Sequence, residues 1–338
     1  LEVGCKNGMR AASIVTQQIK RRPKSPFRTS VLMQQASAKF GFNPKETMRC
    51  AQSLFAGKDG GDGLITYMRT DSIEIDTAKL PIIQQKIVAL YGEAFLERRK
   101  FKNKKAAINI QEAHGAITPT DINLLPSTLK TRLSENEFKL YSLIWERTMA
   151  SQMKDAIFER TTIEFVPNNA PDLASFSFSD QELLFPGYLL ATKEEVRDLK
   201  PPNIKEGDVV DFLSLTKEQH FTDPPPRYND ASMIKTLEEK GIGRPSTYAG
   251  ILSRLAEREY IIAKQKRYEP SDMGRLVSNF LNTSFTDYIS DEFTSNMEDD
   301  LDAISNGSKS KKEVLDLFWS PLEEAVATTG EQVTRRDV

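Results

Sequence analysis

The sequence has no long apolar run, few cysteines and few histidines, and each shortage excludes a class of protein or site. No apolar stretch approaches the ~20 residues that a membrane-spanning helix needs. The two cysteines, Cys5 and Cys50, stand apart without CxxC spacing, which excludes a zinc ribbon and a disulfide scaffold within the chain. The two histidines, His114 and His220, are too few for a multi-histidine metal site.

The beginning of the chain lacks the features of a natural N-terminus. Residues 1–6 contain neither an initiator Met nor the apolar core of a signal peptide, so we interpret the chain as a piece of a longer protein. Its 338 residues, of which 39% are apolar and 28% charged, are typical of a globular protein. This length predicts about two domains, or three small ones.

Charges of one sign are missing from long stretches of the sequence. The segment between Val3 and Lys45 has nine basic residues and no acidic one, and residues 98–105 have six basic residues. From Leu276 to Ser308 there are seven acidic residues and no base. The net charge of −2 therefore averages over separate blocks. The blocks fit a polyanion-binding surface balanced by an acidic outer face, and from charge alone they fit ordinary solvated surfaces equally well.

Periodicity and turn residues predict a mainly helical first half with one strand. A helix over 29–40, with Thr29-Ser30 as its N-cap, is followed by a helix over 45–55 that Pro44 opens. A glycine-rich connection over 57–63 leads to a buried strand over 64–69. Further helices are predicted over 80–90 and 135–152.

The pattern changes after Met153. Short β-branched and aromatic runs divided by turn residues predict strands over 161–166, 174–178, 187–190 and 208–213. Pro224-Pro225-Pro226 then marks a boundary. Beyond it, two helices and a hairpin outline a winged helix, over 229–240, 247–259, 260–262 and 267–270. Helices over 272–282, 291–304 and 311–327 complete the prediction.

The segment from Gly63 to Ser72, GLITYMRTDS, is the richest in reactive groups. On an extended strand, Tyr67, Arg69 and Asp71 would project to one face because they are two residues apart. A phenol becomes a useful nucleophile when a base takes its proton and a cation stabilises the charge that develops. The trio therefore suits attack on a phosphodiester, and it also fits a buried strand tyrosine beside a surface salt bridge.

Two further segments carry polar groups that suit phosphate. His114, in QEAHGAITPT, could donate to a phosphate or relay a proton, or it could be a structural hydrogen-bonding residue. In GIGRPSTY, Arg244 with Ser246 and Thr247 presents a guanidinium, hydroxyls and backbone N–H groups at a helix start. The two hydroxyl residues could equally be plain N-caps.

Taken in order, GLITYMRTDS, QEAH and GIGRPSTYA resemble the signature segments of bacterial type IA DNA topoisomerases. The runs FTDPPPRY, ASMIK and FT followed by MEDDLD extend the resemblance, which covers about Pro26 to Leu322. It implies a multidomain α+β fold that is part of a toroid, with helical winged-helix-like domains and a β-rich arch. The implied division is 1–26 as the end of an arch or base segment, 27–152 as the tyrosine domain, 153–221 as the arch or hinge, 222–330 as the base with its DNA groove, and 331–338 as a tail.

The resemblance also implies a reaction. The tyrosine at position 67 would attack one DNA strand and form a 5′-phosphotyrosyl bond, and relaxation of negatively supercoiled DNA would need no ATP. Arg69 would stabilise charge on the scissile phosphate, and His114 would lie near the tyrosine. The DNA-binding residues would be Asp71, Arg244, Ser246, Thr247 and Arg258. The protein is expected to act as a monomer on a single-stranded segment of DNA, in the cytoplasm at the nucleoid, with an organellar origin left open.

The sequence departs from the family pattern in two respects. The pattern His-Glu-Ala-Ile-Arg-Pro-Thr has Gly115 and Thr118 in place of its Glu and Arg, which weakens DNA contacts there. The Toprim domain, whose acids bind Mg²⁺, and the zinc ribbons are not found, so Mg²⁺ is expected from the Toprim domain and not from this chain. Asp300 and Asp302 have an Asp-x-Asp spacing, but they lie in a helical acidic segment and are not assigned to a metal.

Two alternatives remain beside a topoisomerase fragment. A degenerate, non-catalytic single-stranded DNA-binding paralogue is favoured slightly by Gly115 and Thr118, whereas the intact run from Tyr67 to Ser72 favours the enzyme. A tyrosine recombinase or type IB enzyme would need an Arg, Lys and His set around a tyrosine near its C-terminus, and no such set is found.

Overall fold

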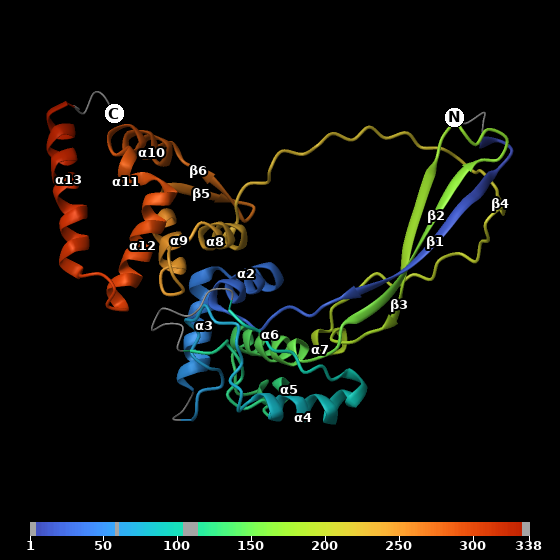
Figure 1. Ribbon diagram of the computed structural model, residues 1–338, viewed down its shortest axis with the longest axis horizontal. Coiled ribbons are helices and arrows are strands. Elements are labelled where there is room, and N and C mark those ends of the chain that lie inside the picture. The colour runs from blue at the N-terminus through green and yellow to red at the C-terminus, as the bar shows by residue number, and fades with distance from the viewer. Residues whose placement is uncertain (1–4, 58–60, 104–113, 333–338) are drawn as a thin grey trace. The chain divides into compact units, whose positions relative to one another are not determined.

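The structure, a computed structural model, describes residues 5–57, 61–103 and 114–332 (Figure 1). Helices and an antiparallel sheet together confirm the predicted α+β class. The chain divides into two compact units. Unit 1 comprises Leu1–Lys24, Gln84–Arg99 and Met149–Pro224, and unit 2 comprises Ser25–Ile83, Lys100–Thr148 and Pro225–Val338. The finer division of the sequence into residues 27–152 and 222–330 stays a prediction.

Unit 1 is built on a four-stranded antiparallel sheet (Figure 1). Its strands are β1 (Met9–Arg21), β2 (Ala156–Pro167), β3 (Phe176–Phe185) and β4 (Val209–Val210), in the spatial order β3-β2-β1-β4. The long β1–β2 pairing runs from Met9 opposite Pro167 to Arg21 opposite Ala156, with an irregularity between Ala11 and Ser13. Short helices η1 (Glu93–Phe95) and α7 (Leu189–Thr192) accompany the sheet.

The strand predictions for unit 1 are only partly confirmed. The strand over 161–166 lies inside β2, and the strand over 174–178 begins at Phe176 in β3. The strand over 187–190 is wrong: Gly187 adopts a φ of 49°, and a Cβ there would lie 2.4 Å from the Asp155 carbonyl oxygen, so the chain turns and begins α7. Of the predicted strand over 208–213, only Val209–Val210 forms a strand, which is β4. Strand β1 was not predicted, because Thr16, Gln17 and Gln18 make its second half polar on both faces.

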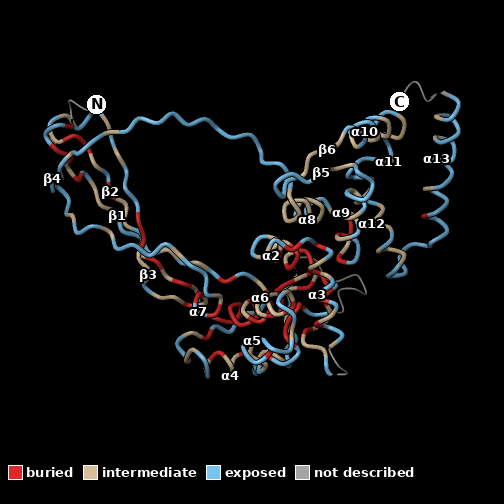
Figure 2. Tube along the Cα trace, turned by 180° about the vertical axis from the view of Figure 1, so that it is seen from behind, coloured by how far each residue is buried: buried red, intermediate tan, exposed pale blue. Residues whose placement is uncertain are grey.

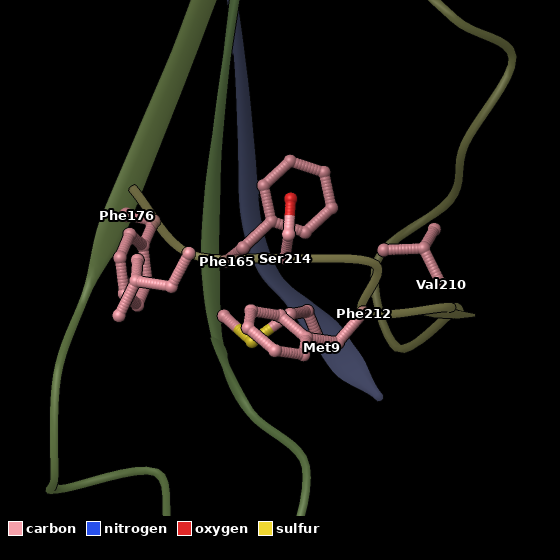
Figure 3. Close-up of a pocket in the computed structure, with 7 residues that line it drawn as sticks. Met9, Phe165, Phe176, Val210, Phe212 and Ser214 are labelled. Carbon is pink, nitrogen blue, oxygen red and sulfur yellow. The ribbon is translucent and has the colours of Figure 1, made fainter. Parts of the chain in front are cut away.

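Apolar side chains are packed together at the two ends of the sheet. At one end, Met9, Phe165 and Phe176 meet the segment after β4 around a cavity of about 240 Å³ (Figure 3). At the other end, Ala156, Phe158 and Leu189 form a small core. Between these ends the β1 side chains from Val15 to Gln18 are exposed. Strand β1 is therefore packed at its ends and solvated in its middle, whereas Ile163 of the neighbouring β2 is buried.

Unit 2 is mainly helical. Its N-terminal elements are α2 (Thr29–Phe40), α3 (Pro44–Ala56) and α5 (Pro126–Leu129), and α4 (Leu80–Tyr91) and α6 (Glu135–Ser151) each contain residues of both units. The later elements are α8 (Asp230–Glu239), α9 (Tyr248–Glu257), β5 (Ile261–Lys264), β6 (Arg267–Pro270), α10 (Asp272–Ser284), α11 (Thr286–Ile289), α12 (Asp291–Ser305) and α13 (Lys311–Gln332). The predicted helices and the helix–helix–hairpin outline are thus confirmed to within a few residues. No described helix is both long and apolar enough to cross a bilayer.

Side-chain caps explain where several of these helices begin. Asn43 accepts a hydrogen bond from the Glu46 backbone N–H at 2.8 Å and starts α3 just before Pro44. Before α6, Ser134 and Glu137 form the reciprocal bonds of a capping box. The predicted Thr29-Ser30 cap of α2 is wrong, because Arg28 is the N-cap residue and the Thr29 hydroxyl bonds to a different segment.

Helices α2, α8 and α9 share a buried core within unit 2. Met33, Ile234, Tyr248 and Leu252 form it, and Figure 2 shows that many buried residues of unit 2 gather near α3 and α6 as well. One carboxylate lies beside this core: Glu238 of α8 accepts from the Ser30 hydroxyl at 2.5 Å and pairs with Arg28 at 2.9 Å. This acid thus ties the start of α2 to the end of α8.

Candidate active site

The segment that carries Tyr67 is irregular and not the predicted strand over 64–69. Only Ile65 pairs in a β-bridge, with Pro119. The Thr66 hydroxyl accepts from the Thr118 backbone N–H at 2.9 Å and donates to the Ala116 carbonyl. Because a threonine hydroxyl takes backbone groups that a ladder would use, the segment bends instead of continuing as a strand.

Thr29 fixes the other side of the same segment. Its hydroxyl donates to the Met68 carbonyl at 2.7 Å, lies 3.0 Å from the Thr70 carbonyl and accepts from the Thr70 N–H at 2.8 Å. Thr29, Met68 and Thr70 are all buried. Buried polar groups without partners are costly, so this network holds the backbone around Tyr67 in one conformation.

The Tyr67 ring contacts two other rings. Its centroid is 4.7 Å from that of His114 and 5.4 Å from that of Phe55, which belongs to α3. Tyr67 is half-buried and His114 is exposed. The Thr70 hydroxyl also donates to the His114 carbonyl at 3.1 Å, which holds the histidine backbone near the tyrosine segment. Two of the three residues predicted to be catalytic are therefore neighbours in the structure.

Arg69 is exposed, and among the described residues its guanidinium has no hydrogen bond or ion pair. The argument that Tyr67 and Arg69 share a face rested on a strand, and it does not apply to this bent segment. The guanidinium is nevertheless only two residues from the half-buried phenol and free to meet an anion from solution.

The segment that begins at His114 packs closely against its neighbours at Gly115 and Thr118, the two positions where it departs from the family pattern. A Cβ on Gly115 would lie 3.0 Å from the Glu74 carbonyl oxygen, which accepts from the Ala116 N–H. Thr118 is 2% exposed and is bonded to Thr66. Neither position has room for a larger side chain without movement. The preceding residues 111–113 lie outside the described part of the chain.

Arg244 lies among carboxylates. Its guanidinium donates to Asp302 at 2.6 Å and lies 3.6 Å from Asp299 and 3.9 Å from Glu298, all on α12. It also donates to the carbonyls of Gly241 and Gly243. The side chain is 22% exposed. Arg244 is thus held by its own protein, and a phosphate would have to compete with these acids.

The other residues predicted to bind DNA differ in exposure. Ser246, Thr247 and Arg258 are exposed at the two ends of α9, and the Thr247 hydroxyl accepts from the Arg244 backbone N–H at 2.8 Å instead of capping α9. Asp71 is half-buried and lies near Tyr248. Burial raises the pKa of Tyr248, and the negative charges of Asp71 and Glu238 raise it further.

Three features of the site were missed at the sequence level. The α12 acids were assigned to an outer acidic face, although the Met-Glu-Asp-Asp-Leu-Asp run was noted. The Arg28–Glu238 pair joins residues far apart in the chain. Lys79 donates to the Pro119 carbonyl at 3.3 Å beside the Ile65 bridge, and burial lowers its pKa. The residues around Lys79 in the sequence form no pattern that would predict a partly buried lysine there.

The described residues contain no group of three His, Cys, Asp or Glu side chains that could hold a metal ion. Asp300 and Asp302, which have the Asp-x-Asp spacing, bond separately to Lys309 and Arg244. The residues present therefore do not fit the Mg²⁺ that the family resemblance implies, and the Mg²⁺ chemistry is not assigned to them.

Comparisons with known proteins agree with the motifs. The DNA topoisomerase 1 proteins of Rickettsia felis and Xylella fastidiosa are 40% and 39% identical to the chain, over 94% and 96% of its length. The chain spans 42% and 41% of the length of these curated relatives. The solved structure of full-length topoisomerase I from Thermotoga maritima superposes with a TM-score of 0.84 at 32% identity, covering 96% of this chain and 53% of that one. Since the family model described as DNA topoisomerase also matches residues 3–316, the chain belongs to the type IA DNA topoisomerase family.

Proposed function

We propose that this chain carries the nucleophile of an enzyme that cuts and rejoins one strand of DNA. The observation that carries the proposal is the Tyr67 side chain, half-buried against His114 on a backbone that Thr29 and Thr66 hold in place. A fixed but accessible phenol beside an imidazole, with an arginine two residues on that has no ion pair in the described part of the chain, is a suitable arrangement for attack on phosphorus.

The reaction is a pair of transesterifications. The Tyr67 oxygen, after losing its proton, attacks the phosphorus and forms a 5′-phosphotyrosine, and the 3′ oxygen leaves and takes up a proton. After the intact strand passes, the 3′ hydroxyl attacks the same phosphorus and releases the tyrosine. Because one phosphoester replaces another, the cycle needs no ATP. Arg69 stabilises charge on the phosphate, and His114 donates to it or relays a proton.

We assign DNA binding to α9 and the segment before it. Ser246, Thr247 and Arg258 offer two hydroxyls and a guanidinium to phosphates of a single strand. Asp71 lies at the edge of this surface, where its negative charge raises the pKa of the Tyr248 phenol. Arg244 can bind a phosphate only if the phosphate replaces Asp302 as the partner of its guanidinium. The substrate of the whole enzyme is negatively supercoiled DNA, the protein acts as a monomer at the nucleoid, and Mg²⁺ comes with the Toprim part.

The test is a covalent adduct. The chain is joined to a Toprim domain from a family member and incubated with Mg²⁺ and a 5′- or 3′-labelled single-stranded oligonucleotide. We expect an adduct to the 5′ end of the cleaved DNA, which Tyr67→Phe abolishes while DNA affinity stays within about twofold, since the phenyl ring keeps the packing. Arg69→Ala should lower the rate severely. A 3′ adduct, or one that survives Tyr67→Phe, contradicts the proposal.

A second candidate is a single-stranded DNA-binding protein without cleavage activity. The close packing at Gly115 and Thr118 favours it, since the segment beside Tyr67 is fitted to small residues where the family pattern has Glu and Arg. DNA binding by the joined protein without any adduct supports this candidate. Return of cleavage on restoring Glu and Arg at these positions would identify the histidine segment as the cause.

A further inference from the structure

Unit 2 contains a groove that neither Tyr67 nor Arg244 lines. It has a volume of about 800 Å³ and lies between the end of α2, the start of α3, the start of α8, one face of α9 and the β5–β6 hairpin. Tyr67 is linked instead to the start of α2, through Thr29, and to the end of α3, through Phe55. The groove and the candidate active site therefore use opposite ends of α2 and α3.

The groove shares no residue with the surface assigned to DNA above. Ala249, Ser253 and Ala256 line it, and their spacing of four and three residues places them on one side of the helix. Ser246, Thr247 and Arg258 lie just outside α9 at its two ends, and none of them lines the groove. A strand bound at one of these surfaces would leave the other free.

Three lysines, Lys39, Lys45 and Lys266, give the groove its charge. All three are exposed, and none has a carboxylate within ion-pair distance in the part of the chain that the structure describes. The one acid that lines the groove, Asp230, accepts the hydrogen bond of the Tyr268 hydroxyl. The groove is thus a concave surface with uncompensated positive charge, which attracts a polyanion.

Lys266 is brought to the groove by an unusual turn. Gln265 and Lys266 both have positive φ, 48° and 61°, in the two-residue turn of the β5–β6 hairpin. Such turns favour Asn and Gly, and non-glycine residues occupy them at an energetic cost. Opposite this turn stands Gly41 at the end of α2, where a Cβ would lie 2.8 Å from the Lys266 ammonium nitrogen. The strained turn and the glycine without a side chain together let the Lys266 ammonium lie against the end of α2, where both residues line the groove.

Two aromatic side chains line the same groove. Phe40, which packs against Phe42 with 5.4 Å between the ring centroids, is half-buried, as is Tyr268. Lysines beside partly exposed rings are the combination that binds single-stranded nucleic acid, because phosphates meet the cations and bases stack on the rings. An acidic peptide would use the lysines but has no base to place on Phe40.

We propose that this groove is a second binding site for single-stranded DNA, separate from the strand at Tyr67. Lys39, Lys45 and Lys266 contact phosphates, and a base stacks on Phe40. The site would hold a second single-stranded segment of the substrate while the first lies against Ser246, Thr247 and Arg258. Its existence does not depend on cleavage at Tyr67, so the adduct test and the test below can fail separately.

The test compares two double variants of this chain that each remove two positive charges. In Lys45→Gln/Lys266→Gln both lysines line the groove, and in the control, Lys130→Gln/Lys311→Gln, both are exposed residues of unit 2 outside it. Binding of labelled oligothymidine is titrated over a range of salt concentrations. Each phosphate contact contributes about 0.7 to the slope of log affinity against log salt, so we expect the groove variant to lose about 1.4 and the control almost nothing.

A separate variant tests the base contact. Phe40→Leu keeps an apolar side chain against Phe42 and should lower oligothymidine affinity severalfold without changing the salt slope. If Lys45→Gln/Lys266→Gln unfolds, Lys45→Arg/Lys266→Arg keeps the charge and must keep the slope, while Lys39→Gln alone must lower it by about 0.7. Unchanged far-ultraviolet circular dichroism establishes that each variant is folded.

Three outcomes overturn the proposal. Equal slopes for the groove and control variants would show that the lysines do not bind phosphate. A loss that appears with duplex DNA but not with oligothymidine would assign the groove to duplex. Loss of polyglutamate binding with unchanged oligothymidine binding would assign it to an acidic protein partner.

Discussion

Two segments of unit 2 hold the residues most concerned with function, and they are fixed by different kinds of interaction. The Tyr67 segment is held by uncharged hydrogen bonds from Thr29 and Thr66 to backbone groups. The Arg244 segment is held by ion pairs to the carboxylates of α12. Uncharged buried bonds respond little to salt, whereas ion pairs near the surface weaken as the ionic strength rises.

This difference predicts that solution conditions act on the two segments separately. The hydrogen bonds by which Thr29 and Thr66 hold the Tyr67 segment are uncharged, so the geometry there should change little between low and high salt. Arg244 should leave Asp302 more readily in high salt, or when the polyanion itself supplies the competing charge. Attack and strand binding would then have different salt dependences within one protein.

The largest effect is expected from Thr29→Val. The methyl group replaces the hydroxyl with little change in shape, and it leaves the Thr70 N–H and the Met68 carbonyl without their partner in a buried place. We expect a loss of about 2–3 kcal/mol in the free energy of unfolding, measured by urea titration, with little dependence on salt. Thr29→Ser, which keeps the hydroxyl, is the control. If the loss of unfolding free energy were smaller in high salt, the Tyr67 segment would not be held by uncharged bonds, and its contrast with the Arg244 segment would fail.

A smaller effect is expected from Asp302→Asn. The change removes the closest charge from Arg244 but keeps the side-chain size, so the free energy of unfolding should fall by about 1 kcal/mol in low salt and less in high salt. Affinity for oligothymidine should rise, because Arg244 becomes easier to release. Asp300→Asn on the same helix, whose partner is the half-exposed Lys309, is the matched control. Equal effects of the two variants on DNA affinity would contradict the role assigned to Arg244.

Gly115→Ala should have an effect of about 1 kcal/mol on stability. The new methyl group meets the Glu74 carbonyl at 3.0 Å, so the backbone of one segment must move by a few tenths of an ångström. The cost should be independent of salt, as it is for other changes near Tyr67. Thermal unfolding in two salt concentrations measures it. Gly250→Ala gives the contrast: nothing lies within 4 Å of the added Cβ and the residue is in α9, so this variant should gain up to about 1 kcal/mol. If Gly115→Ala did not lower stability, the backbone near Gly115 could move to make room for the methyl group at little cost.

The smallest effect is expected from a change of pH, and it concerns Glu46 of α3. Hydrogen bonds from Arg49 and Asn136 lower the pKa of Glu46 from 4.5 to about 2. A carboxylate with a lowered pKa contributes stability that is present above pH 4.5 and is lost as the pH falls toward 2. The difference in unfolding free energy between the wild type and Glu46→Gln should therefore shrink between about pH 5 and pH 2. A constant difference over this range would contradict the assignment.

Elements with strong periodicity could be predicted from the sequence, and elements shaped by distant partners could not. Helices α3, α8 and α12 follow from spacing and capping residues near in the chain. The Tyr67 segment has the composition of a strand, but the threonines that bend it act through residues 29 and 118. A strand prediction from composition has no access to those partners.

The residues of the candidate site were found by motif, whereas their surroundings were not. Tyr67 and His114 meet because Thr70 and Ile65 join their two segments, and the sequence places those segments far apart. Arg244 was predicted to contact phosphate because its segment presents a guanidinium, hydroxyls and backbone N–H groups at a helix start. Its carboxylate partners come from α12, and pairing between helices cannot be derived from charge patterns alone.

The sheet of unit 1 has a mechanical consequence. Apolar side chains are packed near Met9 and near Phe158, and between them the β1 residues from Val15 to Gln18 face water, whereas Ile163 of β2 stays buried. In this stretch of β1 the backbone ladder is the main restraint, so its amide hydrogens should exchange sooner than those at either end of the strand. Under tension β1 should therefore yield first in this stretch, while the contacts near Met9 and Phe158 stay intact.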